Sequence, residues 1–196
     1  MDCAADCPAD LLGLNLAALT ELVRGMPADA LAQARTQAAP KAGDTRFDGG
    51  QVNGYVNQEL IRQKHLGMSI CEQRRQSDAA GVGRATVFVS WFLGQALDEV
   101  LDALDVFLEQ SGLDRGTTYF WVCDYSFDLI AIAEASAKGT GKGPTEELPD
   151  RVKAIGHTVL LLDPWHAPAP LKRIWCGPTA RTLTAQRLPP GSRPRP

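Results

Sequence analysis

The sequence predicts an α/β protein built on a parallel sheet, and three consecutive segments carry that prediction. Residues 84–91 hold a short apolar run, Val87-Phe88-Val89, which is typical of a strand buried on both faces. Residues 93–110 carry a single apolar stripe at helical period: Leu93, Leu97, Val100, Leu101, Leu104, Phe107 and Leu108. Residues 117–123 are aromatic and β-branched, which favours a second strand. A strand, an amphipathic helix and a further buried strand predict a βαβ unit with a parallel pair.

A third strand is predicted over residues 158–162, a β-branched and apolar run between Gly156 and Asp163-Pro164. Its composition is again typical of a strand buried on both faces. Residues 124–155 must connect the second strand to the third. Within them, we expect helices over 129–137 and 146–154, joined by a glycine- and lysine-rich linker over 138–144.

The regions on either side of this unit differ from it in composition. Residues 11–24 are rich in leucine, and we expect a helix there that is capped by Asp10 and ended by Gly25. An alanine-rich helix from Pro27 to Gln37, a linker over 38–54, a polar helix over 56–75 and a loop over 77–83 follow. Residues 177–196 hold five prolines, four arginines and no acidic residue, which indicates a disordered basic tail. The chain is therefore divided into an N-terminal helical and linker region (1–83), an α/β domain (84–176) and a tail (177–196).

The bulk composition narrows the class of protein. The 196 residues are 44% hydrophobic and carry a net charge of −3, which favours neither specific nucleic-acid binding nor an acidic membrane surface. Five cysteines without a paired pattern are typical of reduced thiols. The acidic N-terminus does not resemble a signal peptide, and no run approaches the roughly 18 apolar residues of a membrane span. We therefore expect a soluble cytoplasmic protein without a membrane partner.

Four stretches together resemble a known family. ATVFVSW (85–91), TYFWVCDYS (118–126), IGHTVLLLDPW (155–165) and LKRIWC (171–176) are similar in order and spacing to the TIR-like domains of algal and other protist proteins. The resemblance covers residues 83–176. It implies a flavodoxin-like three-layer fold in which strand 87–89 is central, flanked by 120–122 and 159–162. A full TIR domain has five strands, so the resemblance implies an incomplete sheet of about three strands.

The resemblance also separates two functions. TIR domains that cleave NAD use a glutamate four residues after a tryptophan. Here Trp175 matches the tryptophan, but Thr179 stands in the place of the glutamate. The resemblance therefore implies an intracellular signalling or scaffolding module without a cofactor, whose partner is itself or another TIR-like domain. Three strands would also leave sheet edges open to another chain or to the N-terminal helices. The alternatives are an NAD(P)-cleaving hydrolase of the TIR type and an inactive truncated fragment.

Under the hydrolase alternative, a carboxylate must stabilise an oxocarbenium-like transition state. Asp124 and Asp163 are candidates because each follows a predicted strand, where ligands of parallel sheets bind, and Asp128 lies close by. Capping and turn formation are the more common roles of such residues. The candidates for cofactor binding are Ser90, Trp91, Trp165 and Trp175. A serine at a strand end more often forms a turn, and tryptophans more often pack in the core or at its rim.

The sequence predicts no metal site. Cys3 and Cys7 have no second cysteine pair at zinc-finger spacing, and the three histidines, His65, His157 and His166, are far apart. Cys71 or Cys176 would need a positioned base to act as a nucleophile, and buried inert thiols are more common. The glycine-rich segments 81–83 and 139–143 lack the context of nucleotide-binding loops.

Overall fold

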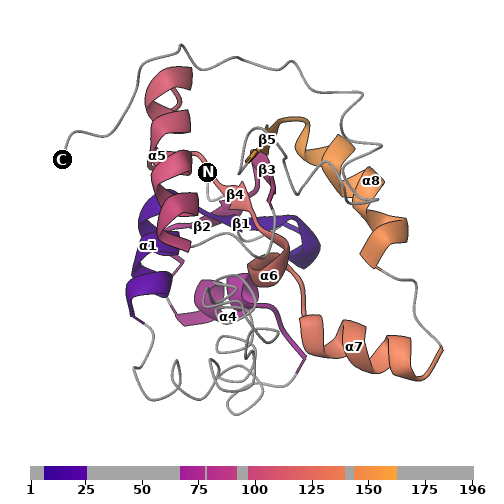
Figure 1. Cartoon of the computed structure of the whole chain (residues 1–196). Helices are drawn as coiled ribbons and strands as arrows, with labels where there is room; N and C mark the ends of the chain where they lie inside the picture. Colours follow the sequence, from indigo (N-terminus) through magenta and orange to yellow (C-terminus); the bar gives the residue numbers. More distant parts are fainter. Residues whose placement is uncertain (1–6, 26–66, 78, 92–96, 140–143, 163–196) are drawn as a thin grey trace, which may run out of the picture.

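A computed structural model describes residues 7–25, 67–77, 79–91, 97–139 and 144–162. Within these ranges the chain forms a mixed sheet of five strands in the order β2-β1-β4-β3-β5, with helices around it (Figure 1). The strands are β1 (Leu12–Leu14), β2 (Val82–Arg84), β3 (Val87–Ser90), β4 (Phe120–Trp121) and β5 (Thr158–Leu160). The helices are η1 (Ala9–Leu11), α1 (Leu16–Arg24), α4 (Ile70–Ser77), α5 (Leu97–Ser111), α6 (Cys123–Ser126), α7 (Leu129–Ala137) and α8 (Pro144–Ile155).

The parallel part of the sheet has β3 in the middle. β3 pairs with β4 on one side and with β5 on the other, and both pairings are parallel. The register places Phe88 opposite Trp121 in β4 and opposite Thr158 in β5. α5 connects β3 to β4, as a parallel connection requires. The predicted α/β class and the position of strand 87–89 between the other two predicted strands are confirmed.

The predicted count of three strands is wrong, because residues assigned to a helix and to a loop form two more. Leu12–Leu14, placed in a helix from the sequence, is β1, and it pairs antiparallel with β2 and with β4. The helix begins only at Leu16, since the Asn15 side chain accepts the Ala18 amide at 2.9 Å and caps it there. Val82–Arg84 is β2, although the sequence predicts a loop that ends at residue 83 and a strand that begins at residue 84. Residues 7–25 thus share one sheet with residues 82–162.

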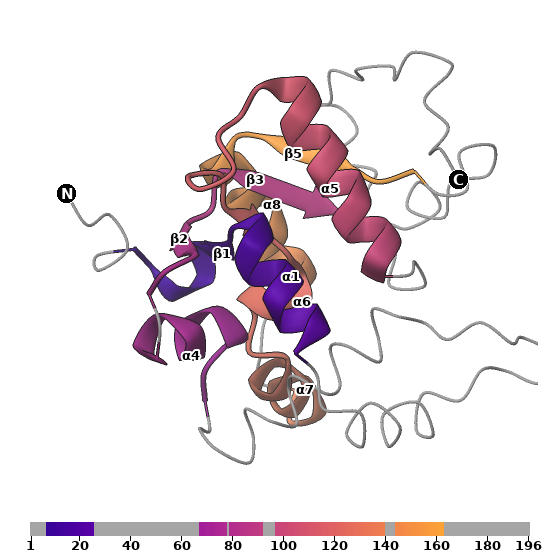
Figure 2. The same ribbon diagram turned by 90° about the vertical axis from the view of Figure 1, so that its left-hand side faces the viewer.

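The side chains of the strands alternate between two layers of helices. Val87, Val89 and Phe120 lie in a large apolar cluster with residues of α1 and α5. Phe88 and Trp121 point to the opposite face, where they pack with Phe127 and with residues of α8. Figures 1 and 2 show the same arrangement, with α1 and α5 on one side of the sheet and α8 on the other.

Other predicted elements differ from the structure mainly at their ends. α7 has the predicted bounds, α8 is longer than predicted, and α5 ends at Ser111 before Gly112, whose φ of 66° suits a glycine. β4 is shorter than predicted because the chain turns into α6 at Cys123. β5 was expected to be buried on both faces. It is only half-buried, because it is the outer strand of the described sheet. Predictions for residues 26–66 and 163–196 lie outside the described residues.

Asp10 connects the N-terminal segment to β4 and to α8, the helix on the other face of the sheet. Its carbonyl accepts the indole N–H of Trp121 at 2.9 Å, and its carboxylate lies 3.3 Å from Nη2 of Arg151 in α8. The Arg151 guanidinium also lies 4.6 Å from the ring centre of Phe127. Trp121 stacks on Phe88 and meets the edge of Phe127, each at 5.0 Å between ring centres. These contacts join η1, β3, β4 and α8 in one aromatic cluster.

Candidate site at the carboxyl edge of the parallel strands

The carboxyl ends of β3 and β4 bring three of the predicted site residues to one edge of the sheet. Ser90 ends β3 and Trp91 follows it, while Asp124 lies three residues beyond the end of β4. All three side chains are buried, with 9%, 6% and 5% of their surface exposed. β5 reaches the same edge, because the Leu161 amide donates to the Ser90 carbonyl at 2.9 Å. Ligands of α/β proteins bind at such an edge.

Asp124 is held in the short helix that follows β4. Val122 is extended, and its carbonyl accepts the amides of Tyr125 and Ser126 at 3.0 and 2.9 Å, which turns the chain. The Cys123 thiol donates to Oδ2 of Asp124 at 3.6 Å. η1, β1 and α4 all contact this helix, which explains the burial of the carboxylate. Asp124 therefore lies inside the protein rather than in an open cleft.

Two buried polar atoms near this edge have no hydrogen-bond partner among the described residues. They are the indole nitrogen of Trp91 and the hydroxyl of Tyr125. Burial raises the pKa of the Tyr125 phenol well above its usual value, and the nearby Asp124 carboxylate raises the pKa further. The phenol is thus a neutral group at physiological pH. Sequence reasoning did not single out Tyr125, although its place directly after Asp124 at the end of a predicted strand was a usable signal.

Cys71 reaches the same region from α4. Its Sγ lies 3.8 Å from Oγ of Ser126, and the residue is completely buried. Burial raises the pKa of the Cys71 thiol to about 12, which outweighs the hydrogen bond from Ser126 that lowers it. A thiol that remains protonated is a poor nucleophile. The geometry agrees with the interpretation of Cys71 as an inert buried thiol.

The remaining predicted residues are not part of this edge or are not described. Oδ1 of Asp128 accepts the amides of Ile130 and Ala131 at 3.1 and 3.0 Å, so this carboxylate caps α7. His157 precedes β5, at the opposite end of the sheet, and its ring meets Phe107 edge-on at 6.0 Å. The residues that lie outside the described ranges are Cys3, His65, Asp163, Trp165, His166, Trp175, Cys176 and Thr179.

Across the described ranges, no three His, Cys, Asp or Glu residues are grouped so that they could hold a metal ion. The helices of those ranges are all too short or too polar to cross a membrane. Comparison of the chain with protein-family models, with curated proteins and with solved structures gives no match.

Proposed function

We propose that this chain is a flavodoxin-like, TIR-like signalling or scaffolding module that acts inside the cell by associating with a second copy of itself. The observation that supports this most is the parallel arrangement of β4, β3 and β5, with β3 in the middle. That is the strand order which the resemblance over residues 83–176 implies. The proposal extends to association with another TIR-like domain, which is the other partner that the resemblance implies.

The chemistry of the carboxyl edge supports association rather than catalysis. Asp124 is buried under η1, β1 and α4, and the Cys71 thiol is held in its protonated form. In the resemblance, Thr179 stands at the position where NAD-cleaving TIR domains have a glutamate.

We place the contact between copies on the β5 side of the sheet. The N-terminal segment already supplies a partner for β4, because β1 pairs with it. In the described sheet β5 is the outer strand on the opposite side, and an outer strand presents unpaired backbone groups to another chain. Leu162, two residues beyond β5, is 42% exposed. Exposed apolar side chains at a sheet edge favour association.

The test measures the mass of the full chain by size-exclusion chromatography with light scattering over a range of concentrations. We expect a mass above that of the monomer, which Leu162→Glu reduces. Val106→Glu is the matched control, since Val106 is 40% exposed but lies on α5. A folded monomer at every concentration would refute association. An equal effect of both substitutions would refute the β5 side.

NAD(P) hydrolysis is the second candidate, and one observation favours it. Ser90 and Asp124 lie at the carboxyl edge of neighbouring parallel strands, where a nucleotide would bind. Incubation of concentrated protein with NAD then releases nicotinamide, and Asp124→Asn abolishes the release. No release above a buffer blank excludes this candidate. An inactive truncated fragment, the third alternative, would instead show poor solubility and non-cooperative melting.

A further inference from the structure

α7 is apolar on every side. Of its nine residues, all but Glu134 and Ser136 are leucine, isoleucine or alanine. Successive residues of a helix are about 100° apart, so apolar residues at nearly every position cover its whole circumference. A helix of this kind is normally buried, because a helix on the surface of a protein keeps one polar face.

The described elements supply an apolar partner for only one side of α7. Ile132 packs against the apolar cluster around Phe88 and Trp121. Ile130 lies about 160° around the helix from Ile132, and it is half-buried but belongs to neither apolar cluster of the described residues. Figures 1 and 2 show no described helix or strand that lies along α7. The side that carries Ile130 therefore needs a further apolar partner.

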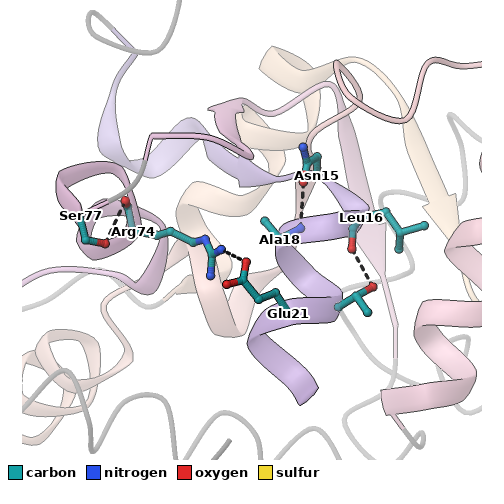
Figure 3. A network of polar contacts seen from close by, with 7 residues as sticks. Asn15, Leu16, Ala18, Glu21, Arg74 and Ser77 are labelled. Atoms are coloured by element: carbon teal, nitrogen blue, oxygen red, sulfur yellow. Dashed lines mark hydrogen bonds and ion pairs between the residues drawn. The ribbon is translucent and has the colours of Figure 1, made fainter. Parts of the chain in front are cut away.

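Residues 26–66 connect α1 to α4, and both helices are fixed to the body of the protein. Val23 in the last turn of α1 and Met68 just before α4 pack against the main apolar cluster. The two helices are also joined by an ion pair between Arg74 and Glu21 (Figure 3). Residues 26–66 thus begin and end at neighbouring elements.

The chain returns from this segment at the same end of the molecule as α7. α4 contacts α6, and only Phe127 and Asp128 separate α6 from α7. Both views place α4 and α7 at one end, whereas β5, from which residues 163–196 continue, lies away from α7 (Figures 1 and 2). Residues 56–66 directly precede the return point. They include four large apolar residues: Val56, Leu60, Ile61 and Leu66.

A second copy of the chain is a poorer partner for α7. The helix has nine residues and is about 14 Å long. Two such helices facing each other would bury far less than the roughly 800 Å² per partner that a stable interface needs. A segment of the same chain needs less area, because docking within one chain does not cost the free translation of a separate molecule.

We propose that residues 56–66 dock on the side of α7 that carries Ile130 and complete the burial of this helix. The contact joins apolar side chains of both partners, so the hydrophobic effect drives it. The proposal is independent of the association of two copies through β5.

Hydrogen exchange of the native full chain, located by mass spectrometry of its peptides, tests the docking. The amides of residues 129–138 should be protected, since a helix of nine residues that is not covered does not persist in water. Leu60→Asp should speed their exchange about tenfold or more, because the burial of a leucine contributes more free energy than a tenfold change requires. Unprotected exchange of 129–138 in the unmodified chain would overturn the proposal.

Two controls show whether the effect is specific. Leu31→Asp makes the same change within 26–66 but outside 56–66, and it should leave the exchange of 129–138 unchanged. Exchange across α5 should be the same in both variants, because undocking leaves the sheet folded. Equal acceleration by the two substitutions would overturn the assignment to 56–66. Protection of α7 that increases with protein concentration would assign the cover to a second copy instead.

Substitutions in α7 test the same contact from the other partner. Ile130→Asp should speed exchange across residues 56–66, whereas Ala131→Asp, at an exposed position of the same turn, should not. Equal effects of these two substitutions would refute the contact. If the aspartate variants do not fold, Leu60→Ala should still speed the exchange of 129–138 more than Leu31→Ala does, with a smaller change. Equal rates in that pair would overturn the proposal.

Discussion

The parallel strands of the sheet can be recognised from their own sequence, whereas the antiparallel strands are defined by partners that are distant in the sequence. β3 and β5 lie within apolar runs bounded by turn residues, and α5 carries its own apolar stripe, so each element is defined within its own sequence. β1 and β2 have three residues each and are positioned by distant partners. The Ala85 amide donates to the Leu11 carbonyl, and the Asn15 amide donates to the Gly81 carbonyl, each at 2.9 Å. An element without a strong local pattern can therefore still be part of the core.

The largest effects are expected when a core side chain is removed from β1 or from α5. Leu14 of β1 and Leu104 of α5 are both completely buried. If β1 is a full part of the core, Leu14→Ala and Leu104→Ala should each lower the free energy of unfolding by about 2–5 kcal/mol, because each leaves a cavity. Urea unfolding followed by circular dichroism measures both. A loss below about 1 kcal/mol for Leu14→Ala alone would show that β1 is peripheral.

The second prediction concerns two glycines that face each other across β1 and β2. An added Cβ at Gly13 would lie 2.7 Å from the backbone oxygen of Phe120, whereas at Gly83 it would meet the ring of Tyr119. A half-exposed ring can move, but the backbone of a neighbouring strand cannot. We expect Gly13→Ala to cost about 1–3 kcal/mol and Gly83→Ala to cost less. Thermal melting of the two variants checks the order, and the reverse order would contradict the packing of β1 against β4.

The third prediction tests the link between the N-terminal segment and α8. Asp10→Asn should destabilise the protein by less than about 1 kcal/mol, because the Asp10 side chain is half-exposed and its charge is screened by water. The substitution keeps the carbonyl that accepts the Trp121 indole. The cost should shrink further in high salt. Urea unfolding at low and high salt measures it. A large, salt-independent cost would mean that the backbone of η1 is disturbed.

The smallest effect is expected in the turn before β4. Oδ1 of Asp114 accepts the Thr117 hydroxyl and the amides of Thr117 and Gly116, which lowers the pKa of this carboxyl below its ordinary value of 3.8. Because the pKa is lower in the folded state, the contribution to stability is present above pH 3.8 and is lost as the pH falls through the folded pKa. Thr117→Val should raise the pKa towards 3.8 in an NMR titration. An unchanged pKa would show that the hydroxyl does not act on it.

The sequence was sufficient for the parallel unit because periodicity identifies α5, and apolar, β-branched and aromatic composition identifies the strands on either side of it. It was insufficient for β1, because Leu11, Leu12 and Leu14 fit the apolar face of a helix as well as they fit a strand. Only the pairing with Arg84, Gly83 and Val82, about 70 residues away, decides between the two. The Asn15 cap was a local signal for the true start of α1, and Ser69 with Glu72 was one for α4.

The candidate site was predicted in part for the same reason. Ser90, Trp91 and Asp124 lie at one edge of the sheet because the carboxyl ends of parallel strands meet there, and their roles at this edge stay predictions. Their burial could not be predicted, because it depends on η1, β1 and α4, which pack against α6 from distant parts of the chain. Cys71 belongs to this region for that reason alone, whereas Tyr125 directly follows Asp124 in the sequence.

Native-state hydrogen exchange of the full chain measures whether the antiparallel strands are as stable as the parallel strands. The Ala85 amide reports on the bond to Leu11 in the N-terminal segment, and the Phe88 amide reports on its bond to the His157 carbonyl beside β5. We predict that both exchange only through global unfolding, with the same free energy of opening. Exchange of Ala85 with a free energy of opening well below that of Phe88 would contradict the account, because the N-terminal strand would then open while the parallel strands stay folded.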